Sequence, residues 1–178
     1  MEDFGGIMET LCAPRWQDRK PGLDRMAALL ALLGDPQKQL RFVHITGTNG
    51  KGSTAAMLAA VLTAAGYSTG LFTSPHLYRF NERFQVNGAP IPDAALDRLT
   101  EHVLAAADTL PEHPTEFELM TAIGFLWFAE AGCDLVVVEV GLGGRLDSTN
   151  IIPAPEAAVI TNIGLEHTAI LGSTLAAI

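Results

Sequence analysis

The sequence is poor in cysteine and in basic residues, and it has no long apolar run. Its 2 cysteines, Cys12 and Cys133, are too few for a disulfide scaffold and belong to no CxxC-like cluster of metal ligands. The 11 Lys and Arg residues against 20 Asp and Glu give a net charge of −9, which disfavours contact with nucleic acid or anionic membranes. No apolar run exceeds residues 26–33, whereas a membrane span needs about 18 residues. We therefore expect neither nucleic acid nor a membrane as a partner.

The composition is typical of one globular domain. The chain has 178 residues, 48% of them hydrophobic and 17% charged, and domains commonly hold about 150 residues. Glu2 and Asp3 stand where a signal peptide would be basic, so we expect a cytoplasmic protein. No internal repeat is visible, and we expect a single domain over residues 1–178.

The spacing of apolar residues in the first half predicts alternating helices and strands. These are a helix over 23–33, a strand over 41–46, a helix over 53–65 and a strand over 68–73. The second helix carries large apolar residues on one face, namely Met57, Leu58, Val61 and Leu62. A strand, a helix and a strand in succession predict a βαβ unit with parallel strands and a right-handed crossover.

The second half adds a hairpin, further helices and further strands. The pattern predicts a short hairpin over 83–91 that projects from the main sheet, helices after Pro92 and over 117–131, and buried strands over 135–140 and 157–161. The Asn87-Gly88 pair suits the hairpin turn. The predicted fold class is α/β, with a mainly parallel sheet flanked by helices and a small β-hairpin.

Polar or glycine-rich segments follow the apolar strands at their carboxyl ends. These segments are 47–53, 74–76, 139–150 and 162–167. Because the carboxyl ends of parallel strands lie along one edge of a sheet, where ligands of open α/β sheets bind, we expect the segments to converge on one cleft.

The segment Gly47–Thr54, with the sequence GTNGKGST, joins a strand to a helix. Its backbone amides and the amino end of the helix suit phosphate oxygens, and Lys51 supplies positive charge, which indicates a phosphate-binding loop and a fold like that of P-loop NTPases. It departs from the pattern G-x-x-x-x-G-K-[ST], since Ile45 replaces the first glycine and Gly52 is inserted after the lysine. A simple connecting turn is the alternative, but such a turn needs no lysine among its glycines.

Glu139 lies in the apolar strand LVVVEV, where an unpaired carboxylate is costly. A Mg²⁺ ion on ATP phosphates would compensate it, because Mg²⁺ prefers one or two carboxylates with phosphate oxygens. A salt bridge to Arg145 or Lys51 is the alternative. His167 suits either a second metal ligand or a surface histidine, and the pattern does not decide between them. His44, within a strand, is expected to be a hydrogen-bonded core residue.

Four segments together resemble the folylpolyglutamate synthase and dihydrofolate synthase family of the Mur ligase superfamily. They are TGTNGKGST, FTSPHL, EVGLGGRLDSTN and NIGLEHTAILG. The inserted Gly52 is the form that this family uses. The resemblance implies a central-type Mur ligase ATP-binding domain. It also implies an enzyme that joins glutamate to a pteroate or folate carboxylate, with ATP as co-substrate and Mg²⁺ as metal.

The resemblance also implies roles for particular residues. The ATP phosphates would be bound by Thr48, Asn49, Gly50, Lys51, Gly52 and Ser53. The metal ligands would be Ser74, Glu139 and His167, and catalysis would depend on Lys51, Glu139 and His167. The substrate site would comprise Thr115, Glu116, Phe117, Glu118, Leu146, Asp147 and Ser148, with Asp18 to Pro21 as a weaker match. We expect Asp147 to accept hydrogen bonds from the pterin ring and Phe117 to pack on its face.

The family also has a C-terminal glutamate-binding domain and a carbamylated lysine, which are not found in this chain. The resemblance therefore implies a truncated, monomeric N-terminal piece that binds nucleotide weakly and does not complete ligation. The small-molecule partners would be ATP, pteroate or folate, and glutamate. Other classes stay open on the sequence: a P-loop kinase or regulatory NTPase, a non-catalytic nucleotide-binding module, and a muramyl ligase.

Overall fold

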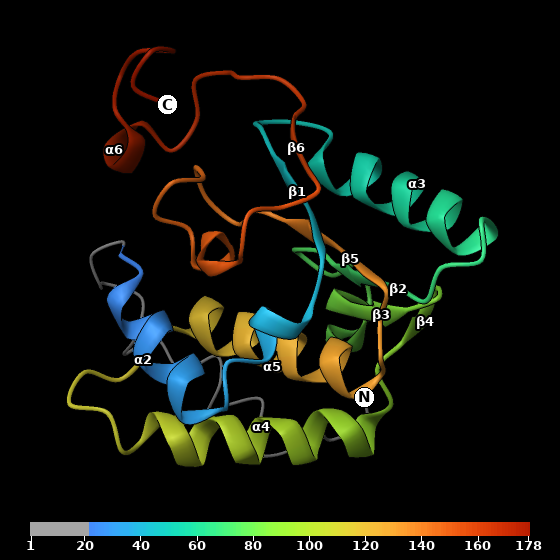
Figure 1. Ribbon diagram of the computed structural model, residues 1–178. Helices are drawn as coiled ribbons and strands as arrows, with labels where there is room; N and C mark the ends of the chain where they lie inside the picture. The colour runs from blue at the N-terminus through green and yellow to red at the C-terminus, as the bar shows by residue number, and fades with distance from the viewer. Residues whose placement is uncertain (1–21) are drawn as a thin grey trace.

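The computed structural model describes residues 22–178, whose strands form one mixed sheet in the order β4-β3-β2-β5-β1-β6 (Figure 1). Strand β1 is parallel to β5 and β6, and β5 is parallel to β2, whereas β3 is antiparallel to β2 and β4. The bounds are β1 (Phe42–Thr46), β2 (Thr69–Phe72), β3 (Phe84–Val86), β4 (Ala89–Pro90), β5 (Leu135–Glu139) and β6 (Ala157–Ile160). The predicted α/β fold with a mainly parallel sheet is confirmed.

Helices cover both faces of this sheet. Helix α3 lies on one face, while α5 lies on the other with α2 and α4 packed against it (Figure 1). The helices are α2 (Asp24–Leu32), α3 (Lys51–Ala64), α4 (Asp93–Ala107), α5 (Glu116–Glu130) and α6 (Thr168–Leu171), with 3₁₀ turns η2 (Pro36–Gln39), η3 (Phe80–Arg83) and η4 (Ser148–Ile151). No helix within residues 22–178 combines the length and the apolar character needed to cross a membrane.

Each face of the sheet carries its own apolar core, because successive strand residues point to opposite faces. The smaller core joins α3 to the strands through Val43, Ile45, Leu71, Val137, Ala55 and Ala59. The larger core lies on the side of α2, α4 and α5 and includes Phe42, Phe72, Phe84, Phe125, Phe128 and Val138. Helix α5 lies between the sheet and helices α2 and α4, which is why it is apolar nearly all round, as predicted for an interior helix.

The predicted apolar face of α3 is partly wrong. Met57 and Val61 are each 63% exposed, whereas the helix packs on the sheet through the fully or almost fully buried Ala55 and Ala59. Leu58 and Leu62 lie partly buried against the same core. Small alanines let the helix approach the strands closely, and in a helix that is apolar on all sides the larger residues do not identify the buried face.

The sheet edges also differ from the prediction. The 83–91 hairpin does not project from the sheet, because β3 pairs with β2 along its length, with Phe84 opposite Phe72. Its turn residues Asn87 and Gly88 have φ angles of 52° and 80°, as expected of a tight hairpin turn. At the other edge β6 is largely exposed rather than buried, since α3 packs over β1, β2 and β5.

The register places the carboxyl ends of the central strands side by side. Ile45 of β1 lies opposite Glu139 of β5, and Thr46 lies opposite Ile160 of β6. The segments that leave these strands therefore begin at the same edge of the sheet, and they form the site described next.

Candidate nucleotide and substrate site

The glycine-rich segment connects β1 directly to α3. Gly50 caps the helix with a left-handed φ of 81°, and α3 begins at Lys51 rather than at the predicted Ser53. The Lys51 ammonium donates hydrogen bonds to the carbonyl oxygens of Gly47 and Thr48, at 2.7 and 3.1 Å, so the positive charge lies against the inside of the turn. The amino end of a long helix and a lysine thus share one location, which suits an anion.

The segment after β6 holds this turn in place. The Thr48 amide donates to the Asn162 carbonyl at 2.8 Å, and the Asn49 amide donates to the Asn162 side-chain oxygen at 2.9 Å. The Gly164 amide donates to the Thr48 hydroxyl at 2.8 Å. The predicted convergence of these segments is confirmed. Since these two loop amides are engaged within the protein, an anion at this turn would depend mainly on the amino end of α3 and on Lys51 for its hydrogen bonds.

Glu139 ends β5 and is only 4% exposed. Its Oε2 accepts a hydrogen bond from the Ser74 amide at 3.1 Å, which brings the segment after β2 to the same place. Burial raises the pKa of Glu139, while the Ser74 amide, the charge of Lys51, the Gly52 amide and the charge of Arg83 oppose that rise.

The alternative of a salt bridge for Glu139 is not supported. The ion pairs of residues 22–178 include none from Glu139, and the side chain of Arg145 is exposed. Lys51 acts on the carboxylate through space while bonding to carbonyl oxygens. A buried carboxylate beside a hydroxyl residue, without an ion pair, is a donor set that fits Mg²⁺.

His167 is exposed and has a left-handed φ of 47° at the start of α6. Within residues 22–178, no hydrogen bond or ion pair joins it to Ser74 or Glu139. In the same part of the chain, no three His, Cys, Asp or Glu side chains are grouped to hold a metal. The predicted set includes a serine and is therefore a different kind of group, and the role of His167 stays a prediction.

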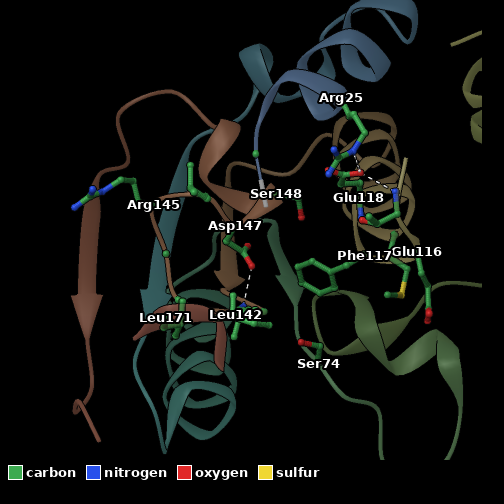
Figure 2. A pocket seen from close by; sticks show the side chains of 18 of the residues that line it. Arg25, Ser74, Glu116, Phe117, Glu118, Leu142, Arg145, Asp147, Ser148 and Leu171 are labelled. Atoms are coloured by element: carbon green, nitrogen blue, oxygen red, sulfur yellow. Dashed lines mark hydrogen bonds and ion pairs between the residues drawn. The ribbon is translucent and has the colours of Figure 1, made fainter. Parts of the chain in front are cut away.

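A cavity of about 750 Å³ adjoins Ser74, and the predicted substrate residues line it (Figure 2). They come from the start of α5 and from the loop after β5: Thr115, Glu116, Phe117, Glu118, Leu146, Asp147 and Ser148. The structure thus brings together two groups that are far apart in the sequence. Asp18 to Pro21, the weaker match, lie outside the described residues.

Phe117 forms an apolar wall of this cavity. A Cβ atom on Gly141 would lie 2.5 Å from the ring carbon Cζ, so the ring rests directly on the backbone of Gly141. The ring also packs at 5.9 Å, centroid to centroid, from Phe72. A flat, held aromatic face beside glycine backbone is a surface on which a planar ligand ring can pack.

Asp147 holds the loop after β5. Its Oδ2 accepts from the Leu142 amide at 2.8 Å, and its Oδ1 accepts from the Thr149 amide at 3.0 Å and from the Thr149 hydroxyl (Figure 2 shows the first of these). Burial raises the pKa of Asp147, and these hydrogen bonds oppose the rise. His44 contacts the same Thr149 hydroxyl at 2.8 Å, which confirms that it is hydrogen-bonded, although it is partly buried rather than a core residue. The loop-holding role of Asp147 was not visible in the sequence.

Glu118 is also engaged within the protein. Its carboxylate accepts from the Arg25 guanidinium at 3.0 and 3.1 Å and from the Thr115 amide at 2.7 Å, while the Thr115 hydroxyl accepts from the Glu118 amide. This capping box fixes the start of α5 at the cavity. The pattern T-x-x-E at residues 115–118 is the sequence signal for it, whereas nothing in the sequence singles out Arg25.

Comparison with known proteins gives consistent matches. A model of the Mur ligase middle domain matches residues 45–178. The dihydrofolate synthase/folylpolyglutamate synthase of Bacillus subtilis is 52% identical over 161 residues, which is 88% of this chain and 37% of that protein. The folylpolyglutamate synthase of Lacticaseibacillus casei is 47% identical over 159 residues, 86% of this chain and 37% of that protein.

A solved structure described as an FPGS-AMPPCP-folate complex has a TM-score of 0.90 and 42% identity, and the match covers 96% of this chain and 43% of that one. The chain therefore spans well under half the length of the relatives it matches.

Proposed function

The chain belongs to the Mur ligase family, and we propose that it is the ATP-binding domain of an ADP-forming ligase that joins L-glutamate to dihydropteroate, tetrahydrofolate or both. The matched relatives are named for these two reactions. The observation that carries the proposal is the position of Ser74, which lines the 750 Å³ cavity and also bonds to Glu139 beside the glycine-rich turn. A carboxylate at that end of the cavity lies next to the place where phosphates would bind.

The reaction follows from the charges of its partners. A carboxylate oxygen attacks the γ-phosphorus of ATP, the bond from phosphorus to the bridging oxygen breaks, and ADP leaves. The glutamate amine then attacks the acyl phosphate, loses a proton, and phosphate leaves as the amide forms. Each step brings charged groups together, so Lys51 and the amino end of α3 hold the phosphates and reduce the repulsion.

The residues at the edge of the sheet fit a magnesium ion. Glu139 and the Ser74 hydroxyl would hold it, with His167 as the third ligand that the family resemblance implies. When bound, Mg²⁺ neutralises phosphate charge. The two residues also bond to each other, because the Glu139 carboxylate accepts a hydrogen bond from the Ser74 amide. This bond fixes the chain where the nucleotide site meets the cavity.

We assign the pteroate part of the substrate to the cavity, with its ring on Phe117. Thr115, Leu146 and Ser148 line the same space. Ser148 and Thr121 share a hydrogen bond at 2.8 Å, which holds the loop after β5 against α5. Since both oxygens of Asp147 already accept backbone amides, pterin contacts with this carboxylate would have to share those oxygens.

Glutamate and the rest of a longer ligase would complete the reaction. We expect the 178-residue protein to be a monomer that binds nucleotide and pteroate and releases no ADP in response to glutamate.

The test is isothermal titration calorimetry of the 178-residue protein with AMPPCP and Mg²⁺, and separately with dihydropteroate. Both ligands should bind, and Lys51→Ala should weaken AMPPCP by about 10-fold or more while leaving dihydropteroate within about 3-fold. The proposal is contradicted if Lys51→Ala leaves the AMPPCP affinity unchanged, or if the wild-type protein does not bind dihydropteroate.

A further inference from the structure

Three arginines line the cavity within residues 22–178, and they are held in different ways. Arg145 is exposed and its side chain extends away from the cavity (Figure 2). Arg25 is committed to a bidentate ion pair with the buried Glu118. Arg83 stands with Ser74 and Pro75 at the end of the cavity that adjoins Glu139.

The position of Arg83 is fixed by its neighbours. Its Nε donates a hydrogen bond to His76 Nδ1 at 3.0 Å, and its guanidinium carbon lies 5.3 Å from the centre of the Phe80 ring. Phe80 itself is 8% exposed, and the His76 ring packs against it edge-on at 5.8 Å. The guanidinium thus lies over a buried ring and takes its orientation from a hydrogen bond to an imidazole, which limits its freedom.

The positive charge of Arg83 would reduce the repulsion between two carboxylates at this end of the cavity. A substrate carboxylate that approaches Ser74 also approaches the buried Glu139, and two carboxylates repel each other. The charge of Arg83 already acts on Glu139, where it helps to lower the pKa against the effect of burial. A planar guanidinium suits a carboxylate better than a single ammonium does, because it can donate two parallel hydrogen bonds.

We propose that Arg83, oriented by His76, binds the carboxylate of the pteroate-type substrate that is to be activated, and so selects acids over their neutral analogues. The proposal rests on the proposed function. Arg83 contacts the substrate directly, and His76 is a positioning residue that acts through Arg83.

The test compares dihydropteroate with its neutral carboxamide by calorimetry. The wild-type protein should bind the acid at least about 10-fold more tightly than the amide, as expected for a hydrogen bond between charged groups. Arg83→Gln should lower the affinity for the acid by about 10- to 100-fold and leave the amide within about 3-fold, which removes the preference. Arg83→Lys should keep part of the preference, and His76→Leu should reduce it by less than Arg83→Gln does.

Arg98→Gln is the matched control, because Arg98 forms an exposed ion pair with Glu130 away from the cavity. It should leave both affinities and the preference unchanged. AMPPCP affinity should change by less than about 3-fold in Arg83→Gln, since the arginine is assigned to the carboxylate and not to the phosphates.

Each other outcome overturns the assignment. Wild-type protein that binds acid and amide equally overturns the role of Arg83 while the proposed function stands. An equal loss of acid and amide in Arg83→Gln indicates a structural role, and a matching loss of AMPPCP indicates a phosphate ligand. If neither pteroate compound binds the wild-type protein, the proposed function fails, and this assignment fails with it.

Discussion

A Cβ atom on Gly52 would lie 3.2 Å from Oε2 of Glu139, so the first turn of α3 approaches the buried carboxylate closely. The nearby Gly52 amide also helps to lower the pKa of Glu139 against the effect of burial. The glycine inserted after Lys51 therefore has a physical reason. It lets the lysine, the amino end of the helix and the carboxylate occupy one small space.

Replacing this glycine should disturb nucleotide binding. Gly52→Ala places a methyl group against the Glu139 carboxylate, which must shift by a few tenths of an ångström or leave its bond to Ser74. We expect AMPPCP affinity to fall by about 10-fold in calorimetry, with the far-ultraviolet circular dichroism unchanged. Unchanged affinity would show that the close approach does not matter to the phosphates.

The charge of Glu139 should make folding stability depend on pH. Burial raises its pKa in the folded state, so the folded protein binds the proton more tightly than the unfolded chain does. Stability from this group is fully present below the unfolded pKa and is lost as the pH rises through the folded pKa.

Glu139→Gln removes that contribution. Relative to the wild type, the variant should therefore gain unfolding free energy as the pH rises through and above the ordinary pKa of a glutamate. Urea unfolding at several pH values measures it, and AMPPCP titration of the same variant should lose its response to Mg²⁺. A difference that does not change with pH would contradict the expectation.

Asp147 should matter for stability as well as for any ligand. Asp147→Ala leaves the buried amides of Leu142 and Thr149 without their acceptors, which should cost about 2–4 kcal/mol in urea unfolding. Asp147→Asn keeps one acceptor oxygen and should cost less. Asp108→Ala, at a 75% exposed side chain, should cost within about 0.5 kcal/mol. A loss of ligand binding by Asp147→Ala without loss of stability would argue for a direct ligand role alone.

The Arg25–Glu118 pair should be the costliest ion pair to break. The two side chains are 12% and 6% exposed, so Glu118→Ala leaves the nearly buried guanidinium with the more exposed Glu112 as its carboxylate partner and removes one half of the capping box of α5. We expect a loss of about 3–5 kcal/mol by urea unfolding. The exposed pair of Arg98 and Glu130 gives the comparison, since Glu130→Ala should cost no more than about 1 kcal/mol. Equal costs for the two variants would contradict this view of burial.

The sequence predicted the positions of helices and strands better than it predicted which of their faces are buried. Turn and cap signals such as Asn87-Gly88 depend only on neighbouring residues, so they can be recognised in the sequence alone. Which side of α3 is buried depends on what packs against it, and Ala55 faces the sheet in place of Met57. The exposure of β6 likewise follows from its place at the edge, which no pattern within the strand records.

For the site, the sequence indicated which segments meet but not how their side chains are used. Strand ends lie at one edge by topology, which is why residues 47–53, 74–76 and 162–167 were placed together correctly. Arg25, which pairs with Glu118, is far away in the sequence, whereas Asp147 accepts hydrogen bonds from Leu142 and Thr149 within its own loop. In both cases the carboxylate is engaged in holding the chain. No pattern in the sequence points to the role proposed for Arg83, because its neighbours His76 and Phe80 come into contact with it only once the 74–83 segment is folded.

The chain of contacts from Asp147 through Thr149 to His44 fixes the direction of its protons. While Asp147 is ionised it can only accept, so the Thr149 hydroxyl points its hydrogen at Oδ1 and must in turn accept from His44 Nε2. Burial lowers the pKa of His44, which favours the neutral ring. The imidazole is thereby confined to the tautomer that carries hydrogen on Nε2 and leaves Nδ1 bare. The negative charge of Asp147, in the loop at the wall of the cavity, thus sets hydrogen positions as far away as strand β1.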